Sequence, residues 1–188
     1  MATKKTQKSR VSPEMGIETL FEIVEKRAKE LGVKTILVAS SSGETGAKAS
    51  EFFQGYNVVV ITHSTGFVAP DTQELTRENR EGIVKAGGKI LTTTHAMGGL
   101  GRAIRRKFET YQSDEIVANT LRIFGQGVKV AIEIAIMAAD SGLISVKEDV
   151  ISMGGTGKSA DTALVLKAAN VQDFFDVKVH EVIRKPWL

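Results

Sequence analysis

One stretch of the sequence, residues 57–62, constrains the fold more than any other. It reads Asn-Val-Val-Val-Ile-Thr, a continuous β-branched run without alternation of apolar and polar positions. A strand with one face in water alternates, whereas a strand of a parallel sheet is covered on both faces and reads as an unbroken apolar run. The stretch therefore predicts an inner strand of a parallel sheet, which requires crossover helices on both faces.

The rest of the chain alternates between strand and helix patterns. Strands are expected at 35–39, 57–62, 89–93, 149–153, 162–166 and 177–183, and helices at 13–31, 47–54, 71–86, 102–108 and 113–139. This order predicts an α/β fold, a three-layer α/β/α sandwich with a mostly parallel sheet of about five strands. Residues 1–12 are expected to form a flexible tail and residues 13–188 a single domain, because no linker or internal repeat interrupts them.

Local signals set some of the expected helix boundaries. Ser12 followed by Pro13 has the pattern of an N-cap and a first helical turn. Asp71 and Glu74 have the spacing of a capping box, so a helix is expected to begin there. Two glycines, at 125 and 127, predict a bend or a close packing contact in the long helix.

Composition and charge exclude several classes of function. The formal net charge is only +3, and four cations lie in the first ten residues, so the remainder offers no broad face for nucleic acid. The chain has no cysteine, which excludes disulfides and thiolate sites. No signal peptide is recognisable, and the longest apolar run, 128–139, is too short to cross a bilayer. We therefore expect a cytoplasmic protein that binds neither membranes nor nucleic acid.

The same apolar run bears on the oligomeric state. Residues 128–139 and the apolar terminal strand are surfaces that one small domain is not expected to bury alone. The sequence therefore predicts a homo-oligomer of unspecified symmetry.

The segment after the first expected strand is rich in hydroxyl groups and glycine. A helix pattern begins directly behind it, so the first amides of that helix and its dipole would face whatever the loop holds. Glycine lets the backbone approach a ligand closely. The pattern predicts a phosphate site formed by Ser40, Ser41, Ser42, Gly43, Thr45 and Gly46. The alternative is an ordinary serine or threonine N-cap in a short turn.

Three more loops follow the other expected parallel strands. Ligands of open α/β sheets bind outside the carboxyl ends of the strands, so these loops should converge with the first one. Two of them begin with a Thr-His pair. The candidate ligand-binding residues are Thr62 and His63, Thr94 and His95, and Gly155, Thr156, Gly157, Lys158 and Asp161. The histidines either contact a ligand as donors, acids or bases, or merely bond loop carbonyls.

Neighbouring side chains in these loops have less specific roles. Phe67 and Met97 either form an apolar wall for a ring or pack in the core. Arg102, Arg105 and Arg106 are expected on a solvated helix face. No third ligand accompanies the two histidines at a useful spacing, so no metal site is expected.

Residues 152–159 nearly match a nucleotide P-loop. They read Ser-Met-Gly-Gly-Thr-Gly-Lys-Ser, with Ser152 in place of the first glycine of G-x-x-x-x-G-K-[ST]. A P-loop feeds a helix and needs a later strand that ends in a magnesium ligand, whereas the residues from 160 onward read as strands. An NTPase is therefore the least favoured interpretation, and a loop that touches phosphate or closes over a ligand is preferred.

Residues 36–47, ILVASSSGETGA, resemble the sugar-phosphate effector loop of the pyruvate kinase C-terminal α/β domain. That loop has the form strand-[ST]-x-[ST]-G-x-[ST]-A, and the match is displaced by one residue at its end, where Gly46 precedes Ala47. Residues 154–165 are similar to the second effector loop of that domain, with Asp161-Thr162 as its polar-Thr pair. No trace of the pyruvate kinase catalytic barrel is present.

The chain thus resembles stand-alone, largely archaeal proteins that are similar to this domain alone, and the resemblance covers residues 14–188. The resemblance implies a pyruvate kinase C-terminal-domain-like fold with flavin mononucleotide (FMN) as the associated ligand. Glu44 stands at a loop position that is often basic in the pyruvate kinases, which disfavours a bisphosphate and leaves one phosphate.

Two functions follow as expectations. The first is a phosphate- or mononucleotide-binding protein that holds FMN at the carboxyl ends of the strands. The second is a sensing or assembly module that binds a sugar phosphate without catalysis. Neither a substrate pocket nor an electron donor has a signature in the sequence, so whether the chain is an enzyme stays open.

Overall fold

The computed structural model describes residues 16–157 and 159–188. The expected tail, the helix-start signal at Ser12 and the candidate ligand residue Lys158 lie outside these ranges.

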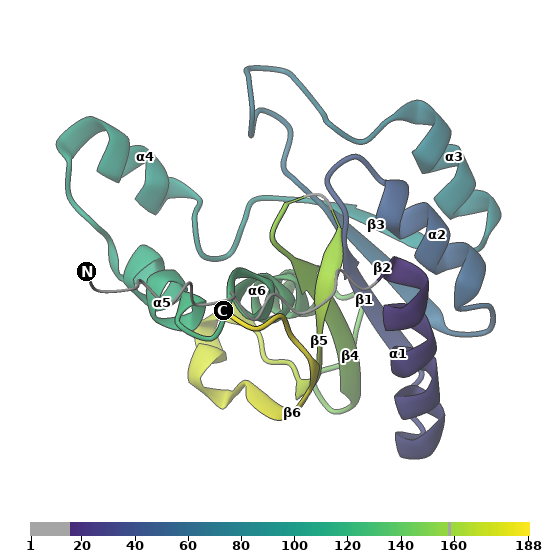
Figure 1. The fold of residues 1–188 in the computed structure, drawn as a ribbon. Helices are drawn as coiled ribbons and strands as arrows, with labels where there is room; N and C mark the ends of the chain where they lie inside the picture. Colours follow the sequence, from purple (N-terminus) through teal and green to yellow (C-terminus); the bar gives the residue numbers. More distant parts are fainter. Residues whose placement is uncertain (1–15, 158) are drawn as a thin grey trace, which may run out of the picture.

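The described residues form one six-stranded sheet with the strand order β3-β2-β1-β4-β5-β6 (Figure 1). The first four of these strands in the sheet are parallel, and β5 and β6 are antiparallel to their neighbours. The strands are β1 (Thr35–Ala39), β2 (Asn57–Thr62), β3 (Lys89–Thr92), β4 (Asp149–Gly155), β5 (Ala160–Lys167) and β6 (Lys178–Arg184). The expected α/β sandwich with a mostly parallel sheet is confirmed, with six strands where about five were expected.

The unbroken apolar runs of β1 and β2 are explained by burial on both faces. Val38 and Val60 point into one core, which they share with helices α1 (Ile17–Leu31), α2 (Glu44–Phe52) and α3 (Arg77–Lys85). Leu37 and Val59, one residue earlier on each strand, point into the other core beneath α6 (Gln126–Asp140). Successive side chains of a strand face opposite sides, so two cores require two apolar sets.

Figure 1 shows α1, α2 and α3 over one face of the sheet and α6 over the other. Helix α5 (Ser113–Arg122) packs beside α6, and α4 (Leu100–Phe108) projects from the edge of the molecule. A 3-10 helix (Val171–Asp176) connects β5 to β6. No helix in the described ranges has the length and apolar character that a membrane crossing requires.

Two expected helix boundaries are wrong. Helix α3 begins at Arg77, where Thr76 is the N-cap and accepts a hydrogen bond from Asn79 N at 3.2 Å, and not at Asp71. Asp71 adopts φ +56, a left-handed conformation that does not start a helix. Glu74, which the pattern assigns to a capping box, instead binds His63 with its carboxylate. The contact with His63, a residue of another loop, thus replaces the capping box that the local pattern predicts.

The expected long helix from 113 to 139 is two helices. The break lies between Arg122 and Gln126, and Gly125 adopts φ +117, which only glycine adopts readily. Gly127 then lets α6 approach β5, because a Cβ at that position would overlap the side chain of Thr162. The two glycines have both of the expected effects, the break and the close contact.

Helix α6 is buried within the monomer. Every residue from Gly127 to Ala139 except the half-buried Val130 is buried, mostly against β1, β4 and β5. One domain therefore covers this run completely, and the expectation that it forms a self-association surface is wrong. Residues 128–139 are apolar because α6 is a central helix of the fold.

The contact between α6 and β4 generates a stability prediction. A Cβ at Gly154 would overlap the backbone of Gly127 and Ala131, which cannot rotate away. We expect Gly154→Ala to lower the free energy of unfolding by about 1–3 kcal/mol, measured by urea denaturation. Gly82→Ala is the matched control, because its Cβ would lie 3.7 Å from Ala47 within helix α3. The control should be stabilising by about 0.5–1 kcal/mol, and equal losses in both variants would contradict the packing argument.

Candidate functional site

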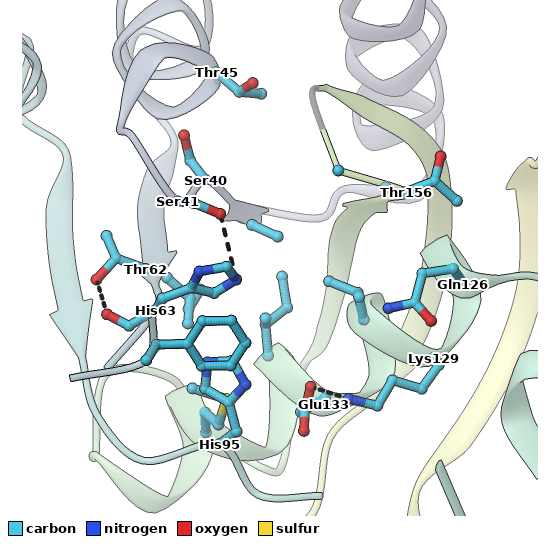
Figure 2. Close-up of a pocket in the computed structure, with 18 of the residues that line it drawn as sticks. Ser40, Ser41, Thr45, Thr62, His63, His95, Gln126, Lys129, Glu133 and Thr156 are labelled. Carbon is cyan, nitrogen blue, oxygen red and sulfur yellow. Dashed lines mark hydrogen bonds and ion pairs between the residues drawn. The ribbon is translucent and has the colours of Figure 1, made fainter. Parts of the chain in front are cut away.

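The candidate site lies where the order of the strands reverses. From β1 the chain crosses to β2 on one side, and it later returns to place β4 on the other side of β1. The loops after β1 and β4 therefore diverge and leave a crevice at the carboxyl ends of the strands. A cavity of about 240 Å³ occupies this position (Figure 2).

The cavity has two walls of different chemistry. Figure 2 shows serine, threonine and histidine side chains on one side and Gln126, Lys129 and Thr156 across from them. Ten of the residues predicted from the sequence line it: Ser40, Ser41, Ser42, Thr45, Thr62, His63, His95, Gly155, Thr156 and Gly157. Loops that are far apart in the sequence are thus brought together, as expected for an open α/β sheet.

The loop after β1 is held in place by its own serines. Ser40 Oγ accepts a hydrogen bond from the amide of Gly46 at 3.0 Å, and Ser42 Oγ accepts one from the amide of Glu44 at 3.4 Å. Gly43 adopts φ +89, and a Cβ at Gly46 would overlap Val60, so both glycines shape the loop without lining the cavity. The hydroxyls of Ser40 and Ser42 thus bind amides in the first turn of α2, although the N-cap residue itself is Gly43 and not a serine or threonine.

Thr45 differs from these serines. Among the described residues, neither its hydroxyl nor its amide has a hydrogen-bond partner, although the residue is buried and lines the cavity in the first turn of α2. An unpaired donor at the positive end of a helix dipole attracts an anion. The Glu44 carboxylate does not weaken this attraction directly, because it is exposed outside the cavity and pairs with Lys48 at 3.0 Å.

The two histidines face each other through an aromatic cluster. The ring of Phe67 lies 4.0 Å from the His63 ring and 4.9 Å from the His95 ring, centroid to centroid, and the His95 ring is stacked. His63 Nδ1 lies 2.6 Å from Glu74 Oε2, and its Nε2 lies 3.3 Å from Ser41 Oγ. Phe67 therefore belongs to the cavity wall, whereas Met97 is buried in the core.

Burial lowers the pKa of His95 to about 4, and the positive charges of Lys129 and Arg102 and the neighbouring His63 act in the same direction. Glu133 opposes the shift without overcoming it. His95 is therefore a neutral imidazole at neutral pH, and it contributes an aromatic face and a hydrogen-bonding nitrogen rather than a charge.

An ion pair on α6 was not predicted as part of the site. Lys129 Nζ bonds Glu133 Oε2, and Glu133 Oε1 accepts the amide of Met97 at 2.8 Å. Both side chains are almost fully buried, and burial lowers the pKa of Lys129 even though Glu133 favours its charged form. The signal was in the sequence, because two opposite charges four residues apart in an apolar helix share one face.

Two arginines also line the cavity. The Arg102 guanidinium lies 4.9 Å from the centroid of the Phe67 ring, and Arg122 Nε donates to Gln126 Oε1 at 2.7 Å. Neither arginine forms an ion pair with any residue that the structure describes. The expectation that Arg102 lies on a solvated helix face is wrong, because the aromatic cluster holds it at the cavity; Arg105 pairs with Glu115 instead.

Two predicted residues, Thr94 and Asp161, lie outside the cavity. Thr94 is exposed and lines a neighbouring hollow. Asp161 stays outside the cavity, where it accepts hydrogen bonds from Thr156 and Thr162, each at 2.6 Å. Gly154 and Gly155 end β4, and the chain turns directly into antiparallel β5. This hairpin lacks the strand–loop–helix geometry that a P-loop requires. In the described ranges, no three His, Asp or Glu side chains are grouped for a metal ion.

The lowered pKa of His95 predicts a pH dependence of stability. Its pKa is about 4 in the folded chain and 6.5 when exposed, so between these values the unfolded state binds more protons. The free energy of unfolding should therefore fall as the pH falls through this window. We expect wild type to lose about 1–2 kcal/mol more than His95→Gln between about pH 7 and pH 4, allowing for partial exposure. Parallel stability curves in urea denaturation would contradict this.

The buried ion pair predicts a strong effect of removing one partner. Lys129→Met leaves the Glu133 carboxylate buried without its cation, so we expect the free energy of unfolding to fall by about 3–5 kcal/mol at neutral pH. The double variant Lys129→Met, Glu133→Gln keeps an acceptor for the amide of Met97 and removes the unpaired charge. Chemical denaturation should show that the double variant regains most of the loss, and no recovery would argue against an electrostatic cause.

Comparison with known proteins finds one matching domain family and similar solved structures. The family model described as the pyruvate kinase alpha/beta domain matches residues 18–166. A crystal structure of a pyruvate kinase from Cryptosporidium parvum is 13% identical, with 84% of this chain and 24% of that chain covered and a TM-score of 0.43. A mutant O-ureido-L-serine synthase with O-ureido-L-serine bound is 21% identical, with 57% and 29% covered and a TM-score of 0.32.

The chain spans less than a third of the length of either of these solved proteins. The family model, in contrast, matches more than half of the present chain, from the second residue of α1 to the penultimate residue of β5. The chain belongs to the pyruvate kinase alpha/beta domain family.

Proposed function

We propose that the chain is a mononucleotide-binding protein that holds FMN in the crevice between β1 and β4. The observation that carries the proposal is the convergence of unpaired anion-attracting groups on one cavity. They come from separate elements: the start of α2, helix α4 with Arg102, and helix α5 with Arg122.

The phosphate would bind at the start of α2. The amide and hydroxyl of Thr45 are free of partners among the described residues, and Ser42 is exposed at the rim. The capped hydroxyls of Ser40 and Ser42 keep the loop preorganised, so little conformational entropy is lost on binding. A phosphate held there gains charge-assisted hydrogen bonds.

The flavin ring would lie against the aromatic cluster. Phe67 and His95 form a stacked pair. Because His95 is a neutral imidazole, the uncharged flavin ring can stack beside it. At about 240 Å³, the cavity is smaller than the usual ligand site of about 300–1,000 Å³, so the phosphate and sugar chain would fill it and the ring would lie at its mouth. Apolar contact comes from Ile134 and Met137 of α6.

We further propose a cytoplasmic location, supported by the absence of cysteine from the sequence.

Self-association is proposed through strand β6, whose Val179 and Val182 are 42% and 47% exposed at the edge of the sheet. In the rival function, a sugar-phosphate sensor, ligand binding would change this association. Sedimentation with and without sugar phosphates separates the two functions.

The proposal predicts that phosphate recognition can be removed selectively. We expect the double variant Ser42→Ala, Thr45→Ala to bind FMN roughly ten- to a hundredfold more weakly, because the bond from the Thr45 hydroxyl to the charged phosphate contributes about 1.5–3 kcal/mol, whereas Ser42 Oγ is already bonded to the amide of Glu44. Fluorescence quenching of the flavin measures the affinity. Riboflavin has the same ring without the phosphate and is the matched control ligand, so its affinity should be equal for wild type and variant.

The visible absorption spectrum of the purified protein is the first measurement. Flavin bands that pass to the supernatant on heating would support the proposal. A colourless protein that takes up neither FMN nor riboflavin would overturn it, and a protein that binds both equally in wild type and variant would remove the phosphate assignment.

A further inference from the structure

Three polar side chains on one wall of the cavity form a linear chain of hydrogen bonds. Ser41 Oγ lies 3.3 Å from His63 Nε2, and His63 Nδ1 lies 2.6 Å from Glu74 Oε2 (the first of these contacts is dashed in Figure 2). The serine follows β1, the histidine follows β2, and the glutamate lies in the loop before α3. The binding of FMN requires neither this order of hydrogen bonds nor Glu74.

The two imidazole nitrogens are used in the order that activates a hydroxyl. A short contact to the Glu74 carboxylate places the proton on His63 Nδ1, and the lone pair of Nε2 then faces the hydroxyl of Ser41. Nucleophile, base and orienting acid have the mutual geometry of acyl-transfer sites. A distance of 3.3 Å between serine and histidine is ordinary for such a site without substrate.

Ser41 is distinguished from its two neighbours by its partner. The hydroxyls of Ser40 and Ser42 accept amides of α2, whereas Ser41 Oγ contacts only His63 among the described residues. Capping therefore explains the outer two serines of the triplet and not the middle one. Ser41 is half-buried and lines the cavity, so its hydroxyl is accessible to a small ligand.

The surroundings favour a tetrahedral oxyanion next to Ser41. The amide of Ser42, a residue that lines the cavity, has no acceptor among the described residues, and it precedes the positive end of α2. Donors at the start of a helix stabilise the charge that develops on a carbonyl oxygen. Phe67 covers one face of the His63 ring at 4.0 Å and shields the base from water.

We propose that Ser41, His63 and Glu74 form a hydrolytic triad that cleaves small carboxylic esters. The cavity of about 240 Å³ limits the acyl group to a short one, and the unpaired Arg102 and Arg122 favour a substrate that carries a negative charge. Ser41 and His63 are the catalytic residues, and Glu74 is a positioning residue that acts through His63.

The reaction proceeds in two balanced halves. Ser41 Oγ bonds to the carbonyl carbon while its proton passes to His63 Nε2, and the ester C–O bond then breaks as that proton passes to the leaving alcohol. Water next donates a proton to Nε2 and attacks the acyl carbon. The bond from Ser41 breaks with return of the proton to Oγ, which releases the carboxylic acid. No oxidant, metal or further reactant is required.

The activity goes beyond mononucleotide binding but uses the same cavity. Bound FMN would exclude the ester, so the protein is tested after removal of any ligand. The probe is p-nitrophenyl acetate, with p-nitrophenol release followed by absorbance and the acylated residue located by mass spectrometry. We expect a burst of p-nitrophenol and one acetyl group on Ser41.

Three variants and one control test the roles. Ser41→Ala should abolish the acetyl adduct, and His63→Gln should slow turnover by about a hundredfold or more. Glu74→Gln should lower kcat with little change in KM, and Glu74→Asp should restore part of it, which a merely structural role would not produce. Ser64→Ala is the matched control, because this serine adjoins His63 in sequence without bonding its ring, and its rate should equal wild type.

Acetylation of lysines with no change in Ser41→Ala would overturn the triad. Equal rates for wild type and Glu74→Gln would overturn the role of the glutamate. The unfolding midpoints of the three variants should equal that of Ser64→Ala, because a lower rate then cannot be caused by a loss of folded protein. A protein that binds FMN but forms no adduct on Ser41 would refute the triad and leave the binding proposal intact.

Discussion

Burial of the central strands on both faces is the constraint on which this structure depends. Because β1 and β2 are apolar at every inner position, helices must cover the sheet from both sides, and the chain must leave each parallel strand at the same edge. The reversal of strand order at β1 then opens a crevice there. The cavity is a consequence of how the core is covered, and the polar loops line it together with residues of α6.

Charge within the cavity is balanced against burial. Lys129 and Glu133 lie in the most apolar helix of the described chain, and their pairing offsets much of the cost of removing both charges from water. The same apolar surroundings keep His95 neutral. Among the described residues that line the cavity, Arg102 and Arg122 are then cations without an ion-pair partner, and the proposed preference for an anion rests on them.

Three consecutive serines show how tertiary structure separates residues of one type. The outer two have local backbone partners and hold the loop, whereas Ser41 meets a histidine that is 22 residues away in the chain and that is oriented by a glutamate from yet another loop. Preorganisation of the loop by the outer pair is what allows the middle one a defined chemical environment. Within this one turn, Ser40 and Ser42 thus hold the backbone of the loop, and Ser41 contacts the histidine.

The sequence by itself determined the fold class, because the apolar runs of β1 and β2 and the intervening helix patterns leave few other architectures. It also identified the loop residues of the cavity wall, since loops after parallel strands meet at one edge, but not the residues that α6 contributes. Tertiary structure decided what depends on distant partners. Glu74 binds His63 instead of forming a capping box, Gly125 interrupts the expected long helix, and the Arg102 guanidinium lies over the Phe67 ring. Local patterns report hydrogen bonds within a turn of the chain, whereas these contacts join residues that only the packed sheet brings together.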